Sequence, residues 1–411
     1  MRPTACNRAS RSWTLVGDVK PLSFMLVAGE PSGDQLAAEL VMALRRAAGP
    51  APVSFFGAGG ERMAAAGVEL AFDLTRHSVI GIPSWAEVRR FLRFRDQLVA
   101  MANERLPDAV IGVDFFAFNG RLAETMRRSL PTGPFHNWRP KLIQDVSPPV
   151  WASRPGRARR LGRTHDLLLS ILPFEKDWYT TRIPSLRVEF VGHPLVDRHS
   201  KDADSVTAAD TARLPSSGHE QPRELLLLPG SRESELRRHL PVMVETARLL
   251  GVRRPLRIRM VLPSARMATF AQSQVAGLAG IKVQVGGLSA ALQQASVALA
   301  STGTVTLECA WFGVPTVTLY KTNWLTYTLG KRLVTVPYLT MPNLLAGGEV
   351  MPEFVQDAAT PAALAGALNR LLDGPLEPVR EKLAAVRRSL GSPGASDRAA
   401  TAILSLLNSG A

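Results

Sequence analysis

The chain has 411 residues, of which 46% are hydrophobic and 20% are charged, and its formal net charge is +14. A chain of this length and composition can bury large hydrophobic cores, which excludes a disordered protein and predicts two domains. The positive charge predicts anionic partners: nucleic acid, a phosphorylated substrate or an acidic membrane surface.

The chain contains no apolar run of the roughly 18 to 20 residues that span a bilayer. Residues 1–22 are basic and lack the apolar core of a signal peptide, so we expect a disordered tail and a cytoplasmic protein. The arginines are spread along several predicted helices without a nucleic-acid motif, so we expect no nucleic-acid partner. Cys6 and Cys309 indicate neither a disulfide framework nor a metal site.

Short apolar runs alternate with helical stretches in residues 23–200. The run at 23–28 is followed by a small-residue turn at 29–34 and an amphipathic helix at 35–46, which is the opening of a doubly wound α/β domain. Further strands are predicted at 53–58, 109–113, 142–146, 167–172 and 188–191. Because these runs are apolar throughout, they indicate a parallel sheet covered on both faces.

The composition shifts to Asp, Ser, Thr, Ala and Pro in residues 201–222, where we predict a linker. The alternation then restarts in a second Rossmann-like domain, residues 223–390. Its predicted strands are 225–228, 258–262, 281–285, 297–300 and 316–320, and its predicted closing helices are 361–372 and 377–389. A final helix, within residues 396–411, is a candidate to pack on the first domain.

Two strand-to-helix junctions of the second domain are candidate anion sites. Thr302, Gly303 and Thr304 precede a predicted helix at 305–312, whose free N–H groups and dipole favour a phosphate. Glu308, one turn into this helix, is placed to accept hydrogen bonds from the hydroxyls of a ribose. Arg232, at the start of another helix, is a candidate cation for a diphosphate. The alternatives are a capped helix with a structural glutamate and a surface arginine.

Asp114 ends the predicted strand 109–113 at the edge of the sheet where α/β enzymes place catalytic groups. Desolvation by the phenylalanines that follow would raise its pKa and make it a better general base. The alternative is a solvated aspartate that caps the next helix. Residues 57–60 fail as a dinucleotide fingerprint, and the chain has neither a P-loop nor metal-spaced His or Cys residues, so we predict no cofactor and no metal.

Several ordered motifs resemble lipid-A-disaccharide synthases, which are GT-B glycosyltransferases. The motifs are Gly29-Glu30-Pro31-Ser32-Gly33-Asp34, Ser147-Pro148-Pro149-Val150-Trp151-Ala152, Pro173-Phe174-Glu175-Lys176, Val191-Gly192-His193-Pro194-Leu195 and Pro342-Asn343-Leu344-Leu345-Ala346-Gly347. Asp114 and Asn119 match the first Asp and the final Asn of the family's IDxPDFN motif. The residues that depart from the family pattern are Phe115, Phe116, Ala117, Ser153 and Gly348.

The resemblance implies two Rossmann-like domains that face a cleft, and an inverting transfer without metal. UDP-diacylglucosamine would donate its sugar to the 6-hydroxyl of diacylglucosamine 1-phosphate, giving the lipid A disaccharide. Asp114 would be the general base, and Arg232 would stabilise the departing UDP. The implied substrate contacts are Glu30, Ser32, Gly33, Asp34, Asn119, Ser147, His193, Ser231, Thr302, Gly303, Thr304, Glu308, Asn343, Glu349 and Gln356.

Two other classes of function stay open. One is another GT-B enzyme, such as an undecaprenyl-linked glucosaminyltransferase or a UDP-sugar epimerase. The other is a non-catalytic lipid-binding relative, which the altered residues after Asp114 suggest. A homodimer is also open.

An apolar stripe in residues 84–99 is a candidate membrane-binding face. At helical spacing it comprises Trp85, Val88, Phe91, Leu92, Leu98 and Val99, beside Arg89, Arg90, Arg93 and Arg95. The residues alone leave open whether the stripe packs on the sheet or lies in a membrane interface. The resemblance implies a peripheral protein on the cytoplasmic face of the inner membrane. We therefore predict that Trp85→Ser with Phe91→Ser weakens binding to anionic vesicles without lowering the melting temperature.

Overall fold

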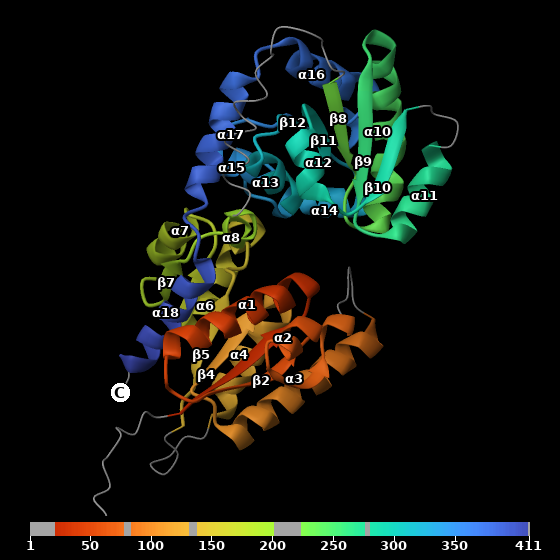
Figure 1. Ribbon diagram of the computed structural model, residues 1–411. Helices are drawn as coiled ribbons and strands as arrows, with labels where there is room; N and C mark the ends of the chain where they lie inside the picture. The colour runs from red at the N-terminus through yellow and green to blue at the C-terminus, as the bar shows by residue number, and fades with distance from the viewer. Residues whose placement is uncertain (1–20, 78–83, 131–137, 201–222, 276–279, 410–411) are drawn as a thin grey trace, which may run out of the picture. The chain divides into compact units, whose positions relative to one another are not determined.

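The computed structural model describes residues 21–77, 84–130, 138–200, 223–275 and 280–409. The predicted tail, except for its last two residues, and the predicted linker at 201–222 lie outside these residues. The chain divides into two units, Met1–Asp145 with Ala399–Ala411, and Val146–Arg398 (Figure 1). Our sequence-based domain limits, 23–200 and 223–390, stay a prediction.

The first unit contains a parallel sheet in the order β3-β2-β1-β4-β5. Its elements are β1 (Leu22–Ala28), α1 (Pro31–Ala48), β2 (Val53–Gly59), α2 (Glu61–Ala65), β3 (Glu69–Asp73), η1 (Thr75–His77), α3 (Trp85–Arg105), β4 (Ala109–Val113), α4 (Phe116–Ser129), β5 (Lys141–Asp145) and α18 (Ala395–Asn408) from Ala399 onward.

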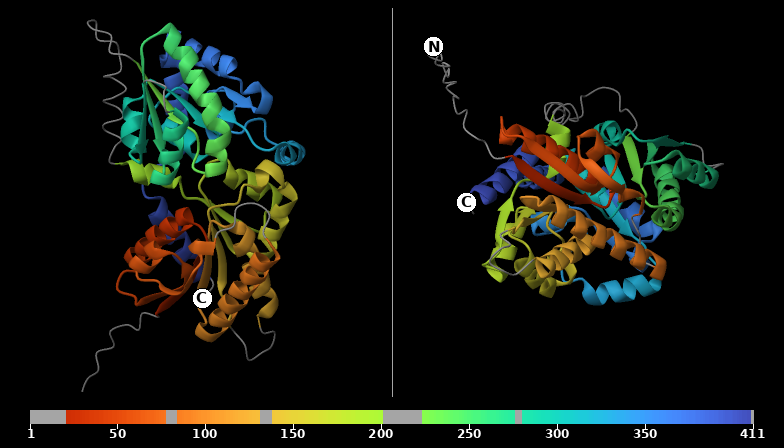
Figure 2. Two further views of the ribbon diagram at one scale, coloured as in Figure 1. Left: turned by 90° about the vertical axis from the view of Figure 1, so that its right-hand side faces the viewer. Right: turned by 90° about the horizontal axis from the view of Figure 1, so that it is seen from below.

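Helices cover both faces of this first sheet. Helices α3 and α4 lie side by side (Figure 2), and their buried Leu98 and Phe118 join Met25 in one hydrophobic cluster. Strand alternation directs Phe24 and Leu26 to the opposite face, where both are fully buried. Helix α1 packs against β1, β2 and β4. Burial on both faces explains why these strands are continuously apolar.

The second unit contains a parallel six-stranded sheet, β10-β9-β8-β11-β12-β13, and the parallel strand pair of β6 and β7. Its elements are α5 (Val150–Ser153), η2 (Pro155–Arg157), α6 (Ala158–Thr164), β6 (Leu167–Ser170), α7 (Glu175–Arg182), β7 (Arg187–Phe190), α8 (Pro194–His199), β8 (Arg223–Leu228), α10 (Glu233–Arg253), β9 (Leu256–Leu262), α11 (Ala265–Val275), β10 (Ile281–Val285), α12 (Leu288–Gln294), β11 (Val297–Ser301), α13 (Thr304–Trp311), β12 (Thr316–Tyr320), α14 (Trp324–Leu333), α15 (Met341–Ala346), β13 (Glu353–Val355), η4 (Gln356–Ala358), α16 (Pro361–Asp373) and α17 (Glu377–Ser389).

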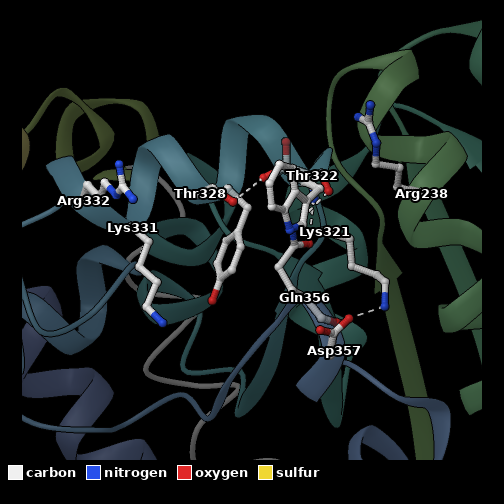
Figure 3. Close-up of a pocket in the computed structure, with 10 residues that line it drawn as sticks. Arg238, Lys321, Thr322, Thr328, Lys331, Arg332, Gln356 and Asp357 are labelled. Atoms are coloured by element: carbon white, nitrogen blue, oxygen red, sulfur yellow. Dashed lines mark hydrogen bonds between the residues drawn. The ribbon is translucent and has the colours of Figure 1, made fainter.

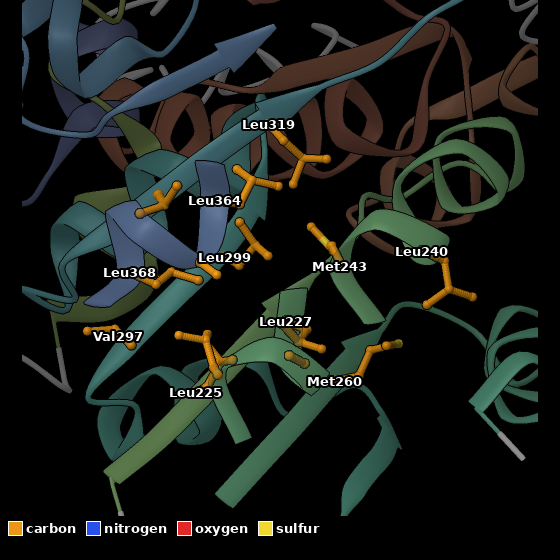
Figure 4. Packing of buried hydrophobic residues seen from close by; sticks show 14 of the residues in the cluster. Leu225, Leu227, Leu240, Met243, Met260, Val297, Leu299, Leu319, Leu364 and Leu368 are labelled. Carbon is orange, nitrogen blue, oxygen red and sulfur yellow. The ribbon is translucent and has the colours of Figure 1, made fainter. Parts of the chain in front are cut away.

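The six-stranded sheet separates two hydrophobic cores. Leu225 and Leu227 of β8 face a cluster with Met243 of α10 and Leu364 of α16 (Figure 4). The intervening Leu226 and Leu228 face the other cluster, to which α13 and α17 contribute. This alternation places helices on both sides of the sheet, so the predicted fold class is confirmed.

Most strands lie within two residues of their predicted bounds, but two were missed. Strands β3 and β13 form outer edges of their sheets. Strand β3 has no fully buried residue and is bounded by Glu69 and Asp73, and β13 has only 3 residues, so neither produces a long apolar run. Helix α1 begins at Pro31, four residues before the predicted start, because proline is well accommodated in a first helical turn. In the part of the chain that the structure describes, no helix is long and apolar enough to cross a membrane.

The predicted membrane-binding stripe is divided in the structure. Trp85 is 85% exposed, but Leu98 is fully buried in the core of the first unit. Phe91 and Val99 pack against the same core, and the Phe91 ring contacts those of Phe115 and Phe118 at centroid distances of 6.0 and 5.8 Å. The prediction that the whole stripe faces a membrane is therefore wrong, since Phe91, Leu98 and Val99 belong to the core, although Leu92 is 38% exposed.

The double variant proposed above should accordingly be separated into its parts. We expect Phe91→Ser to lower the free energy of unfolding by about 1–3 kcal/mol, because it removes ring contacts in the core. Trp85→Ser should change it by less than about 0.5 kcal/mol, because this side chain is exposed. Urea denaturation of the two single variants measures both values. Equal stability of the two variants would contradict this assignment.

Candidate active site

In each unit, the strands that follow the first one are added first on one side of it and then on its other side. The first strand therefore marks a switch point in the sheet. In the first unit, β2 and β3 lie on one side of β1, and β4 lies on the other side. In the second unit, β9 and β10 lie on one side of β8, and β11 lies on the other side. Ligands of open α/β sheets bind beyond the carboxyl ends of the strands at such switch points. Ligand sites are therefore expected beyond the carboxyl ends of β1 and β4, and beyond those of β8 and β11.

Asp114 follows β4 directly and lies at the first switch point. Ala28, the last residue of β1, is aligned with Val113, the last residue of β4. The turn after β1 approaches Asp114 closely, because a β-carbon added at Gly33 would lie 3.6 Å from the Asp114 Cβ. The same β-carbon would lie 3.2 Å from the Val113 carbonyl oxygen, so close packing against the end of β4 favours the small residue at Gly33.

The backbone at Asp114 is held in an unusual conformation. Asp114 and Phe115 have φ angles of 51° and 41°, in the left-handed region that non-glycine residues seldom adopt. The Asp114 carbonyl accepts hydrogen bonds from Asn119 Nδ2 at 2.9 Å and Gln144 Nε2 at 3.0 Å. The Asp114 N–H donates to the Asp145 carbonyl at 2.9 Å. Such strain persists where surrounding contacts determine it, and it is concentrated at functional sites.

The departure of Phe115 from the family pattern has a structural explanation. A β-carbon at Gly29 would lie 2.2 Å from the Phe115 ring, so the ring packs directly on the glycine backbone. The ring also contacts Phe91 and Phe118. Phe115 therefore covers the base of the Asp114 turn with apolar surface.

Burial raises the pKa of the Asp114 carboxyl group above its usual value, and the Phe115 backbone N–H opposes this shift only in part. The side chain is half-buried, so it keeps access to solvent. A carboxylate with a raised pKa is a stronger base than a fully solvated one. The position, the backbone strain and the pKa all favour the general-base hypothesis for Asp114.

The turn after β1 contains both exposed and structural residues. Glu30 and Ser32 are exposed at the start of α1, where Glu30 is the N-cap residue, and no side-chain hydrogen bond caps the helix. Asp34, in contrast, is 4% exposed, and its carboxylate accepts hydrogen bonds from the backbone N–H groups of Gly60, Arg62 and Met63. Asp34 thus supports the start of α2, and we withdraw it from the predicted substrate contacts.

Arg232 and Ser231 lie at the second switch point, after β8. Both side chains are exposed, and Arg232 is the N-cap residue of α10. The Arg232 guanidinium is 3.3 Å from Glu235 Oε1, and its side chain remains 56% exposed. A β-carbon at Gly230 would lie 3.3 Å from the Ser301 Oγ at the end of β11. The loop after β8 therefore lies next to the loop after β11.

Helix α13 begins in that neighbouring loop with Gly303 as its N-cap residue, and no side-chain hydrogen bond caps it. The alternative of a helix capped by this small polar cluster is therefore not favoured. Gly303 and Thr304 are exposed, and Thr302 is half-buried, so this helix start is accessible to an anion. Glu308 is half-buried one turn later. Burial raises the pKa of its carboxyl group, and the neighbouring His199 and Arg198 oppose this rise only in part.

The next two strands continue the same edge of the sheet. Gln356 follows β13 and bonds through its side chain to both backbone groups of Thr322, which follows β12.

The fully buried His239 donates its Nδ1 hydrogen to the Pro229 carbonyl and accepts from the Lys321 N–H at its Nε2. This imidazole links the loop after β8 to the end of β12.

A pocket of about 830 Å³ lies at this edge (Figure 3). Its lining combines four cations with two aromatic side chains: Arg238, Lys321, Thr322, Trp324, Tyr327, Thr328, Lys331, Arg332, Gln356 and Asp357. Lys331 and Arg332 of α14 lie on one side of the pocket, and Arg238 of α10 lies on the other. Cations suit a phosphate, and aromatic rings suit the apolar face of a sugar.

Four of the predicted substrate contacts are buried, and three of them bond to neighbouring groups. Asn343 is fully buried, and its amide bonds to Glu353 and to the backbone of Val350 and Met351. His193 caps α8 by accepting from the Leu195 N–H, and burial lowers its pKa to about 4, so it is neutral at pH 7.

The other two are Asn119 and Ser147. The 3% exposed Asn119 bonds to the Val27 and Asp114 carbonyls, and Ser147 is 4% exposed. Burial disfavours a direct substrate contact for these four side chains. Glu349, in contrast, is exposed.

The sequence interpretation missed several residues of the site. Gln144 supports Asp114 from the neighbouring strand, and Lys321 and Arg238 contribute charge to the pocket. The sequence signal for Lys321 was its position directly after a predicted strand, which is the same signal that identified Asp114. No sequence signal identified Gln144, because a buried polar residue within a strand has many structural roles.

Known proteins resemble this chain over nearly its whole length. A family model described as lipid-A-disaccharide synthetase matches residues 24–394. The lipid-A-disaccharide synthase of Myxococcus xanthus is 38% identical over 403 residues, which cover 95% of this chain and 99% of that protein. The synthase of Geobacter metallireducens is 36% identical, covering 93% and 97%, and that of Pseudomonas aeruginosa is 37% identical, covering 94% and 98%.

Solved structures share the fold at lower identity. A UDP-GlcNAc 2-epimerase from Neisseria meningitidis, bound to UDP-GlcNAc, is 12% identical with a TM-score of 0.60, covering 93% of this chain and 99% of that one. MurG from Acinetobacter baumannii is 14% identical with a TM-score of 0.55, covering 94% and 100%. At these identities the likeness supports the GT-B fold alone.

Proposed function

The chain belongs to the lipid-A-disaccharide synthase family, and from this premise we propose the substrates and the roles of its residues. It is a glycosyltransferase of lipid A biosynthesis. We propose UDP-2,3-diacylglucosamine as the donor and 2,3-diacylglucosamine 1-phosphate as the acceptor. The products are the lipid A disaccharide 1-phosphate and UDP.

Asp114 acts on the acceptor in this proposal. Its carboxylate takes the proton of the 6-hydroxyl as the oxygen attacks the anomeric carbon of the donor. The raised pKa of Asp114 supports this role, because the proton then has a better acceptor than a solvated aspartate. Asn119 and Gln144 act as positioning residues, since they hold the Asp114 carbonyl.

The residues after β8 and β11 act on the donor. As the bond to the anomeric carbon breaks, negative charge develops on the diphosphate of UDP. The Arg232 guanidinium and the start of α13 stabilise this charge, and Glu308 accepts hydrogen bonds from the ribose. Their accessible positions at adjacent strand ends support this assignment. Ser231, Thr302, Gly303 and Thr304 contribute to the same phosphate site, with Gln356 near the donor sugar.

The observation that carries the proposal is the position of Asp114, half-buried after β4 at the switch point, with a raised pKa. The substitutions that follow it do not favour a non-catalytic relative, because Phe115 packs on Gly29 and leaves the carboxylate access to solvent. The epimerases and MurG share only 12–15% identity with this chain, against 34–38% for the synthases, so those alternatives are not favoured.

The proposed substrates carry acyl chains, so we propose that the enzyme works at the anionic cytoplasmic face of the inner membrane. The net charge of +14 supports this location. The exposed Trp85, near the arginines of α3, supports a contact of the first unit with lipid.

Incubation of the protein with both proposed substrates tests the reaction directly. We expect equal amounts of UDP and disaccharide, separated by mass and by chromatography. Two controls distinguish transfer from hydrolysis of the donor. One replaces the acceptor with its 1-phosphate-free form, and the other omits the acceptor. Release of UDP without disaccharide would contradict the proposal.

A further inference from the structure

A second pocket, of about 500 Å³, lies in the second unit and has no role in the reaction described above. It is formed by α5, α7, α15 and the segment that follows α14. Its lining residues are Trp151, Pro155, Phe174, Trp178, Arg182, Thr335, Val336, Pro337 and Leu344. We refer to it as the aromatic pocket.

The lining of the aromatic pocket is mostly hydrocarbon. Trp151 and Phe174 form an edge-to-face pair with centroids 4.9 Å apart. The indole N–H of Trp151 already donates to Glu175 Oε1 at 2.9 Å, so it is not available to a ligand. Arg182 is the charged residue of the lining and lies 4.3 Å from the ring centre of Trp178. A lining of this kind favours an aliphatic ligand with one anionic or strongly polar end.

The walls of the aromatic pocket are held together by hydrogen bonds. The Thr335 N–H donates to the Ala152 carbonyl at 2.9 Å, and its hydroxyl donates to the Trp151 carbonyl at 3.2 Å. These bonds attach the segment after α14 to α5. The Tyr179 hydroxyl donates to the Pro148 carbonyl at 2.5 Å, which attaches α7 to the segment before α5. The pocket is therefore formed before any ligand binds, which reduces the entropy cost of binding.

Exposed apolar side chains lie on both sides of the lining segment in the sequence. Leu333 and Val334 directly precede it and are 39% and 38% exposed, and Leu339 follows it and is 39% exposed. Lys331 and Arg332, exposed at the end of α14, come just before them. Residues 333–339 thus present apolar side chains both to solvent and to the pocket. The cations Lys331 and Arg332 come just before them in the sequence.

We propose that the aromatic pocket binds one fatty acyl chain of a substrate lipid, which enters along Leu333 and Val334. Arg182 at the exposed end of α7 then interacts with the polar end of that lipid. The inference rests on the proposed function only in that the substrates are acylated. A long apolar chain matches the hydrocarbon lining, and the neighbouring cations match a phosphate-bearing lipid.

The test is the dependence of affinity on chain length, measured with alkyl phosphates from butyl to tetradecyl below their micelle concentrations. Each methylene buried in the pocket should lower the Kd about fourfold, until the chain fills the pocket and the Kd levels off. Val336→Trp, which places a large ring in the pocket, should make the Kd level off at a shorter chain. Val252→Trp is the matched control, because Val252 is 78% exposed on α10.

A butyl-to-tetradecyl series that gives the same curve for Val336→Trp and wild type would overturn the proposal, as would an equal change in Val252→Trp.

A tetradecyl phosphate with a terminal diazirine gives a second test in the wild-type protein. It should label peptides that contain Trp151, Phe174 or Leu344, and labelling elsewhere alone would refute the pocket. Inorganic phosphate, the headgroup control, should bind equally to all three proteins. If a second copy of the chain fills the pocket instead, the Kd would rise with protein concentration and the labelling would be lost, which also refutes the proposal.

The acyl-chain pocket and the proposed reaction can be refuted independently of each other. Disaccharide synthesis without a chain-length shift would refute the acyl-chain pocket alone. A chain-length shift without disaccharide synthesis would refute the proposed reaction alone.

Discussion

Asp114→Asn is expected to reduce turnover by about 10²- to 10⁴-fold, the usual contribution of a general base. The amide keeps the shape of the side chain but does not accept the proton of the acceptor hydroxyl. The hydrogen bonds that hold this turn involve the backbone of Asp114, so they are kept. UDP affinity should be unchanged, because the proposed diphosphate contacts belong to other residues.

The measurement is a single-turnover assay, in which the chemical step limits the rate. Asp96→Asn is the matched control, because it makes the same substitution at an exposed carboxylate of the first unit. Calorimetric titration with UDP shows whether the Asp114→Asn protein is folded and competent. If that variant keeps more than a tenth of wild-type turnover, Asp114 is not the base.

The pH profile of the wild type gives an independent check on Asp114. A general base is active when it is deprotonated, so kcat/KM should fall as the pH decreases through the pKa of Asp114. Because burial raises this pKa, the acid limb should lie above the ordinary range of an aspartate. In Asp114→Asn the residual activity should lose this limb. An acid limb that persists in the variant would assign the titration to another group.

The sequence predicted the residues that lie at strand ends because one physical rule places them. Parallel strands end at a common edge, so Asp114 after one strand and Thr302 after another were identified from their position in the alternating pattern alone. The same rule, applied to the strand at 316–320, would have identified Lys321. The sheet order, which decides which strand ends are neighbours, requires long-range pairing that a single sequence does not encode locally.

Motif resemblance did not distinguish residues that support the site from those accessible to a ligand. Asp34, Asn119 and Asn343 belong to family motifs, yet their side chains bond to backbone groups of distant or neighbouring turns. A buried amide or carboxylate that bonds to the backbone stabilises a loop, since its loss leaves several polar groups unpaired. Residues that support the site and residues that contact a ligand can therefore both belong to a family motif. Their bonding partners in the structure distinguish the two roles.

Helical periodicity gave a similar partial result for α3. The spacing of Trp85 and Phe91 correctly predicted an amphipathic helix, but periodicity describes only the direction of a side chain around the axis. Whether the apolar face meets protein or solvent depends on where the neighbouring α4 ends along that axis. Phe91 lies beside Phe118 of α4, whereas Trp85 at the start of α3 is exposed.

Arg232→Ala is expected to weaken UDP binding by about 10- to 150-fold and to leave uridine binding nearly unchanged. A hydrogen bond from a charged group contributes roughly 1.5–3 kcal/mol, and the contacts that are lost involve phosphate only. Protein stability should change little, because the ion pair of Arg232 with Glu235 is at the surface and such pairs contribute little. Isothermal titration of both ligands measures the ratio of the two effects.

Arg237→Ala is the matched control for this experiment. Arg237 lies in the same helix, has the same 56% side-chain exposure and forms an equivalent ion pair with Glu233. It is one turn further from the start of α10, so its loss should affect neither ligand. Higher salt should reduce the difference between wild type and Arg232→Ala for UDP, because ions screen an exposed guanidinium. Equal losses of UDP and uridine affinity in Arg232→Ala would show that Arg232 shapes the loop after β8 and has no direct contact with the diphosphate.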